Sequence, residues 1–375
     1  MPRYFKLLLK VIFAGLMVWY VLAQIQLHDS VVTTIEPTQT LAGHLLGDWQ
    51  SETWQFQPTD ERPLIAHGQG WEARPGFFTV MREIRLGWVA VGLAAWVFLL
   101  LIVSLRWKIL LDAVGIPTSF GRSLRLCFIG YFFNNVMPGL TGGDILRAVF
   151  VTRGLSENRT RAAMSVLVDR VIGLFALVMI AAVVLTWLRF QDNWGAIPSL
   201  ARVARGVYLV VGVAALGGAI YLSRRARNFL RFDALLKRLP AQERLGLIDD
   251  SLTIYRERPW ATARAVFLSF PIHLCGIFTF FCMGLALGAP LGFADELVIY
   301  PVVQTVSSIP IAPAGWGIGE GLYGFFFQQY GSLFTLGVAV SILFRLCTQV
   351  GFGLIGGLVW VLSRERRDPS LNDPN

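Results

Sequence analysis

Long apolar runs alternate along the chain with short polar segments. A helix needs about 20 apolar residues to cross the hydrocarbon core of a bilayer, so each long run predicts one transmembrane helix. Some runs end in aromatic and basic residues, which is typical of the membrane interface; Arg106, Trp107 and Lys108 form one such group. The pattern predicts an all-α polytopic membrane protein with about six transmembrane helices, at residues 7–23, 86–105, 162–188, 206–222, 265–287 and 336–362.

Two further apolar stretches are each interrupted by proline and glycine. The first break runs from Pro138 to Asp144 and the second from Pro310 to Glu320, and the pieces on either side are too short to cross a bilayer alone. Irregular backbone at membrane depth is tolerated where protein or water satisfies its polar groups, and transporters often place substrate sites there. We therefore expect two re-entrant helical hairpins, at about residues 119–154 and 292–331.

The charges indicate how these segments are oriented. Residues 25–87 hold four Lys or Arg and eight Asp or Glu, basic residues flank the first hairpin, and none lies between Pro290 and Gly331. Because basic residues favour the cytoplasmic side, residues 25–87 are expected outside and both termini inside, in a multi-pass protein of the inner (cytoplasmic) membrane. The hairpins then enter from opposite sides, which is typical of the inverted repeats of transporters.

Four successive parts are expected. They are a first transmembrane helix (1–24), an extracytoplasmic insert (25–87), a transmembrane domain (88–362) with a cytoplasmic amphipathic segment at 224–262, and a cytoplasmic tail (363–375). The first helix is either retained or a cleaved signal peptide. Alternating residues at 31–35 and 76–80 predict either short strands or an extended cap on the outer surface of the insert. The separated histidines of the insert either bind metal or are simply solvated.

The composition agrees with a membrane protein. The chain is 55% hydrophobic and 15% charged, whereas soluble domains contain roughly 25% charged residues. The formal net charge of +9 is attributed to orientation and to contact with anionic lipids rather than to nucleic acid, because the bases cluster at the ends of apolar runs. The four cysteines lack metal-ligand spacing and no Walker motif is present, so no metal or other cofactor is expected.

Each hairpin tip carries one acidic residue with two possible roles. Asp144 follows Thr141 by three residues and Glu320 follows Gly317 by three, which is the spacing of a helix capping box. In one interpretation the two acids only cap short helices. In the other, the N-termini of these helices present free N–H groups and partial positive charge to an anionic group such as a phosphate.

Three arginines, Arg147, Arg170 and Arg345, fall within apolar segments. A charge at the centre of a membrane helix costs about 2.5–3.5 kcal/mol, so such residues are expected to have a partner or a role. Arg345 has no acidic residue within one helical turn and is predicted to meet either Glu320 or an anionic head group. The local pairs predicted for the other two arginines are Asp144 with Arg147 and Asp169 with Arg170.

Amide side chains near the tips are expected either to line a polar cavity or to bond backbone carbonyls that the tips leave free. The candidate substrate-binding residues are Asn134, Asn135, Thr141, Gly142, Gly143, Asp144, Arg147, Asp169, Arg170, Gly315, Gly317, Gly319, Glu320, Arg345 and Gln349, with Gln304 as a further possible lining residue. No residue is predicted to be catalytic.

A set of motifs spread over residues 88–362 has the order seen in one known family. The motifs are Arg106-Trp107, Phe128 to Asn134 with Pro138-Gly139, Gly142 to Asp144 with Arg147, Val168 to Arg170 with Gly173, and Pro313 to Gly317 with Gly319-Glu320. In these motifs the chain resembles the flippase-like membrane domain family related to the lysylphosphatidylglycerol synthase transmembrane region, which includes archaeal glycosylation proteins and hopanoid-associated membrane proteins.

The resemblance implies a flippase, with a membrane lipid that is anionic, aminoacylated or lipid-linked as its substrate. Two other functions stay open: an accessory subunit that partners a lipid-modifying or glycosylation enzyme, and an integral-membrane enzyme acting on a lipid-linked phosphate or sugar, with Asp144, Asp169 and Glu320 as its candidate groups. The two-domain synthases of this family add a soluble aminoacyl-transfer domain. Because the sequence ends shortly after residue 362, aminoacyl transfer is not expected here.

Overall fold

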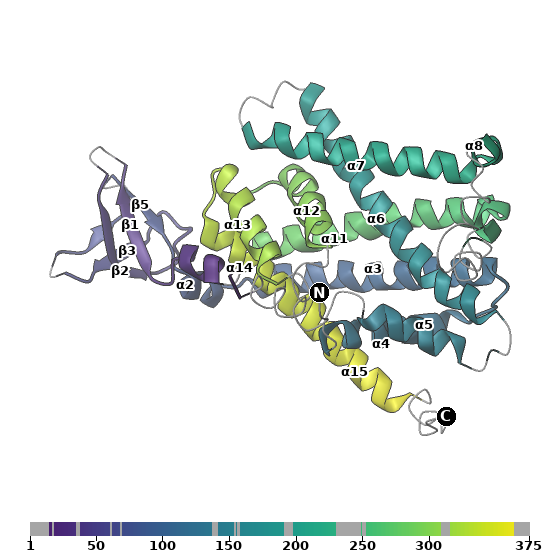
Figure 1. Ribbon diagram of the computed structural model, residues 1–375. Coiled ribbons are helices and arrows are strands. Elements are labelled where there is room, and N and C mark those ends of the chain that lie inside the picture. Colours follow the sequence, from purple (N-terminus) through teal and green to yellow (C-terminus); the bar gives the residue numbers. More distant parts are fainter. Residues whose placement is uncertain are drawn as a thin grey trace. The chain divides into compact units, whose positions relative to one another are not determined.

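The computed structural model in Figure 1 forms two compact units, which combine Met1–Ala94 with Phe278–Leu346 and Ala95–Ile277 with Cys347–Asn375. They are called the first and the second unit below. Most of the first predicted span and both hairpin tips, including Thr141 and Gly315, lie outside the described residues. The structure describes residues 15–16, 19–34, 38–60, 62–67, 70–136, 142–153, 155, 158–190, 198–229, 249, 253–308 and 316–363.

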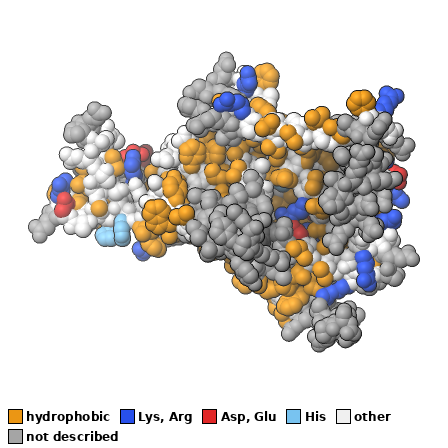
Figure 2. Space-filling model, in the orientation of Figure 1, with side chains coloured by type: hydrophobic (Ala, Val, Ile, Leu, Met, Phe, Trp, Pro, Cys, Tyr) orange, Lys and Arg blue, Asp and Glu red, His pale blue; other side chains and the backbone are white. Residues whose placement is uncertain are grey.

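Among the described residues, four helices are long and apolar enough to span a membrane, so the multi-pass helical prediction is confirmed for four of the six spans. The predicted span at 206–222 falls within α7 (Pro198–Leu222), where the apolar part is shorter, Ala204–Gly218. Figure 2 shows hydrophobic side chains over much of the helical surface, as expected for contact with lipid. The four helices are α3 (Leu86–Ala113), α6 (Arg159–Phe190), α11 (Pro259–Ala286) and the continuous helix Phe334–Leu362.

The insert contains a sheet, so the all-α class predicted for the chain is wrong for this segment. Five antiparallel strands take the order β4-β3-β2-β1-β5. Val31 and Phe56 are fully buried in its small apolar core with Trp54 and Ile65, and the strand predicted at 31–35 is confirmed as β1. The strands are β1 (Asp29–Thr33), β2 (Thr40–Leu46), β3 (Gln55–Pro58), β4 (Ile65–Ala66) and β5 (Trp71–Arg74).

The second strand predicted in the insert, at 76–80, is instead the start of a helix, α2 (Phe77–Arg82). The carboxylate of Asp29 explains how this segment is held. Its Oδ1 accepts from the Gly76 N–H at 2.7 Å and its Oδ2 accepts from the Leu45 N–H at 2.9 Å. The Asp29 side chain therefore links the residue before α2 to the sheet.

In the second unit, two short helices precede α6: α4 (Phe120–Val136) and α5 (Gly142–Thr152). They lie side by side (Figure 1), and α4 also packs against α15 (Phe352–Leu362). Trp107, Leu126 and Ile129 are fully buried in the apolar core that these helices share with α3 and α6. Of the predicted amphipathic segment, α8 (Arg224–Phe229) and residues 253–257 are helical, and much of the remainder is outside the described part.

In the first unit, another pair of short helices precedes the last long helix: α12 (Phe293–Ser307) and α13 (Ile318–Gln329). α13 packs against α12 and against α14 (Phe334–Arg345). Aromatic rings fill the contact, and the Phe280 ring lies parallel to that of Tyr323 with centroids 4.2 Å apart. One π-helical stretch, η3 (Leu346–Gly351), follows α14.

Candidate functional site

A network of buried charges lies in the second unit around Asp169 of α6. The Nε of Arg106, on α3, donates to the Asp169 carboxylate at 2.9 Å, and the guanidinium of Arg147, on α5, lies 3.7 Å from its other oxygen. All three side chains are less than one-tenth exposed. One carboxylate therefore interacts with two arginines that come from different helices.

Aromatic and hydroxyl groups hold these arginines in place. The guanidinium of Arg147 lies over the Trp107 ring, 4.2 Å from its centroid, and the indole N–H of Trp107 donates to Ser165 at 3.1 Å. Arg106 donates its second bond to the hydroxyl of Ser269 at 2.7 Å. Cation–π contacts gain strength in desolvated sites, so the indole compensates part of the cost of burying Arg147.

Asp144, at the start of α5, connects this network to Arg170. Its carboxylate lies 3.4 Å from the Arg147 guanidinium and also pairs with Arg170 Nε. The predicted pair Asp144–Arg147 is therefore confirmed, whereas the predicted pair Asp169–Arg170 is wrong. Adjacent residues of a helix point about 100° apart, so Asp169 and Arg170 turn to different partners.

The first unit contains a smaller site with the same kinds of groups. Glu320, in the first turn of α13, accepts from the Gly317 N–H at 2.7 Å and pairs with Arg345 Nε at 2.7 Å. Arg345 also lies over the ring of Trp316, 4.9 Å from its centroid. Of the two partners predicted for Arg345, Glu320 is thus confirmed, and this acid both caps α13 and neutralises the arginine. Gly317 has φ of 84°, a backbone conformation that favours glycine.

The two sites share an arrangement that sequence similarity does not reveal. In each unit the third residue of the second short helix is an acid, Asp144 or Glu320, and it pairs with an arginine of the following long helix. The two partners, Arg170 and Arg345, lie 26 and 25 residues after their acids. In each unit an arginine also lies over an indole ring.

The amide side chains of α4 bond to backbone groups, and of these two only Asn135 bonds a carbonyl, the second of the two predicted roles. Asn134 accepts from the Gly143 N–H at 2.9 Å, and thus occupies one free donor at the N-terminus of α5. Asn135 donates to the carbonyl of Gln349 at 2.7 Å. Gln349 lies in η3, where the wider π-helical turn disrupts the regular hydrogen-bond ladder, and π-helical turns occur frequently at functional sites.

Gly143→Ala is expected to destabilise the protein by about 1–3 kcal/mol, because a Cβ there would overlap the Gly130 carbonyl and the Asn134 amide and force α4 and α5 apart. The matched control is Gly121→Ala, at a position of α4 with open space around it, where alanine should be neutral or stabilising. Melting temperatures of the two purified variants in one detergent make the comparison. Equal melting temperatures would show that the close contact does not matter.

The residues of these sites that sequence reasoning missed include Arg106, Trp107 and Trp316. Arg106 and Trp107 were predicted to anchor the end of a span at the interface, which is wrong because α3 continues to Ala113 and both side chains are buried. Their occurrence in the family motifs was the available signal. Binding of a substrate at the candidate residues stays a prediction.

Comparison with known proteins agrees with the motifs. Residues 76–356 match the family described as the lysylphosphatidylglycerol synthase TM region. The chain belongs to this family. UPF0104 membrane proteins of three archaea are similar to this chain. The protein of Pyrococcus horikoshii is 24% identical, over 76% of this chain and 90% of the relative. The proteins of Methanothermobacter thermautotrophicus and Methanocaldococcus jannaschii are 26% and 20% identical, over 75% and 71% of this chain and 86% and 82% of the relatives. The match to the family begins after β5, so the strands of the sheet lie outside it.

Proposed function

We propose that this protein is a flippase that moves a lipid with an anionic, aminoacylated or lipid-linked head group between the leaflets of a membrane. The observation that carries the proposal is the repeated acid–arginine pair at the start of α5 and of α13. Ionisable groups within membrane segments are costly and typically mark a substrate or ion pathway. Two such sites, one in each half of the sequence, are what an inverted-repeat transporter would use.

The lengths of the short helices support re-entrant hairpins. α4, α5, α12 and α13 have 17, 11, 15 and 12 residues, so each is about 17–26 Å long, less than the roughly 30 Å of the hydrocarbon core. We propose that each pair enters the membrane and returns on the same side, from the cytoplasm for the first and from outside for the second. Six spans and cytoplasmic termini complete this topology.

The charge of the network in the second unit favours an anionic head group. Its three arginines and two aspartates leave a formal charge of +1. The Nε of Arg147 is buried and has no acceptor among the residues that the structure describes. Guanidinium groups bind phosphate through paired N–H donors.

Membership of the family agrees with a lipid substrate. Lysylphosphatidylglycerol, which gives the family its description, is an aminoacylated phospholipid. We propose that the transmembrane region handles such a lipid without altering it covalently, and that a lipid-modifying enzyme is a possible partner. In the alternative, the protein is only an accessory subunit of that enzyme.

Reconstitution tests the proposal directly. Liposomes containing only this protein should make fluorescent phosphatidylglycerol of the inner leaflet accessible to a membrane-impermeant quencher, faster than protein-free liposomes do. Fluorescent phosphatidylcholine is the control for general leakage and should respond less. Quenching no faster than in empty liposomes would favour the accessory role, and a covalently altered lipid found by mass spectrometry would favour an enzyme.

A further inference from the structure

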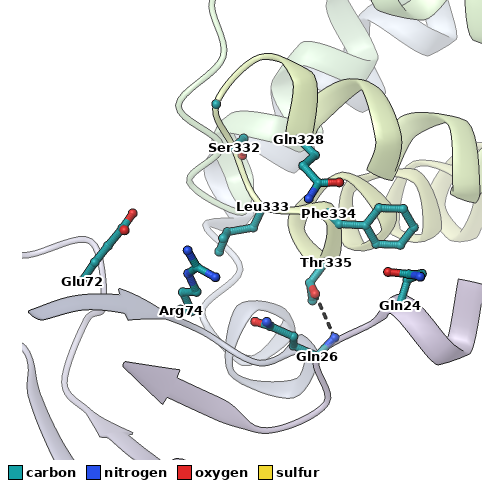
Figure 3. Close-up of a pocket in the computed structure, with 10 residues that line it drawn as sticks. Gln24, Gln26, Glu72, Arg74, Gln328, Ser332, Leu333, Phe334 and Thr335 are labelled. Atoms are coloured by element: carbon teal, nitrogen blue, oxygen red, sulfur yellow. Dashed lines mark hydrogen bonds between the residues drawn. The ribbon is translucent and has the colours of Figure 1, made fainter. Parts of the chain in front are cut away.

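A polar cavity of about 330 Å³ lies within the first unit, between the edge of the sheet and the turn that joins α13 to α14 (Figure 3). This volume is near the lower end for small-molecule sites, about 300–1,000 Å³. Strand β5 and the segment before β1 form one wall, and the helical turn forms the other. The lining residues are Gln24, Gln26, Glu72, Arg74, Gln328, Gly331, Ser332, Leu333, Phe334 and Thr335.

Backbone hydrogen bonds fix the wall at Gln26. Its N–H donates to the hydroxyl oxygen of Thr335 at 3.0 Å, and its carbonyl accepts from the Phe77 N–H at 2.8 Å. Thr335 is only 3% exposed, so it is part of a packed surface. The Gln26 side chain is not used in either bond and projects into the cavity toward Arg74 in Figure 3. The cavity is thus preformed, with its amide group available.

The groups facing the cavity include both donors and acceptors. Glu72 and Arg74 alternate along β5, so they point to the same side of the sheet and their charges cancel. The Nε of Arg74 and the hydroxyl of Ser332 are buried without a hydrogen-bond partner in the described part of the chain. A ligand in the cavity would therefore meet donors and acceptors on the accessible parts of the lining side chains.

We propose that this cavity binds a neutral polyhydroxylated group, that is, a sugar carried on a lipid head group or free in solution. Each sugar hydroxyl both donates and accepts hydrogen bonds, as do the carboxamides and hydroxyls that line the cavity. The lining also holds one pair of opposite charges, so a neutral group fits the cavity better than an ion does. The Phe334 ring supplies an apolar surface for the C–H face of the sugar. The lipid-borne form rests on the proposed function, whereas the sugar site itself does not.

Saturation-transfer NMR tests the proposal with the full-length protein in phosphatidylcholine nanodiscs, which contain no sugar-based detergent. Methyl β-D-glucoside and N-acetylglucosamine are the probes. At least one of them should receive saturation from the wild-type protein. Gln26→Ala should weaken that binding by about tenfold through the loss of its amide bonds, while keeping the backbone bond to Thr335. Gln57→Ala, at an exposed position of β3 outside the cavity, is the matched control and should bind as the wild type does.

Each outcome has a defined meaning. Absence of saturation for both sugars, equal binding by wild type and Gln26→Ala, or preferential binding of zwitterionic L-serine would overturn the sugar site. A glucosyl lipid added to the nanodiscs should displace the soluble sugar if the head group is lipid-borne, and displacement by free sugars alone identifies a soluble ligand. The NMR experiment measures sugar binding and not lipid movement. If the protein binds sugar but moves no lipid in liposomes, the flippase proposal is contradicted and the sugar site is not.

Discussion

Asp169→Ala is expected to lower the free energy of unfolding by about 3–5 kcal/mol. Asp169 is the carboxylate next to both Arg106 and Arg147, at 2.9 and 3.7 Å, and all three side chains are buried. Removing one partner of a buried ion pair leaves an uncompensated charge in a medium that cannot solvate it. Two arginines would be affected at once, because Asp144 reaches Arg147 at 3.4 Å but does not replace the bond to Arg106.

An exposed ion pair provides the matched control. Asp60 pairs with Arg62 at 2.9 Å, but both side chains are about half exposed. Such pairs contribute roughly 0–1 kcal/mol, so Asp60→Ala should change stability little. Thermal melting of the two variants in the same lipid nanodiscs compares them. If the melting temperatures of Asp169→Ala and Asp60→Ala both equal that of the wild type within error, water must reach the charges around Asp169. Burial of these charges would then not make Asp169 important for stability.

Arg345→Gln is expected to abolish lipid movement and also to destabilise the protein. Arg345 and Glu320 form a buried pair, so the single variant leaves Glu320 uncompensated. The variant that separates the two effects is Glu320→Gln with Arg345→Gln. Both charges are then absent, the amide of residue 320 can still accept from the Gly317 N–H, and stability should largely recover.

Transport in the double variant is the decisive measurement. If the charge of Arg345 binds an anionic head group, phosphatidylglycerol movement should stay at the level of protein-free liposomes although the melting temperature is restored. Arg62→Gln, at an exposed arginine of the same unit, should transport normally. If the double variant transports lipid as fast as the wild type, Glu320 and Arg345 have a purely structural role. Arg147 and Arg170 would then be the candidate residues for binding the head group.

The membrane-spanning helices were predictable because their signal is local. A run of apolar residues of bilayer length forms a helix in lipid, because the helix is the structure in which a single segment satisfies its own backbone groups. The same applies to the caps: Glu320 and Gly317 are three residues apart and were paired correctly from their spacing. The strand at 31–35 was found from alternation, whereas the segment at 76–80 has a similar pattern but forms α2, next to the Gly76 N–H that donates to Asp29.

The sequence alone determined the multi-pass helical character and the presence of arginines in apolar segments. Tertiary structure decided which charges meet. Arg106 and Asp169 are 63 residues apart, and a pair so distant depends on how α3 and α6 pack rather than on spacing along one helix. The burial of side chains also depends on packing between distant elements. Arg106 and Trp107 have the local pattern of an interfacial anchor, yet α3 continues beyond them and residues of α5 and α6 cover them. Local pattern fixes the elements, and packing between distant elements fixes the electrostatics of the site.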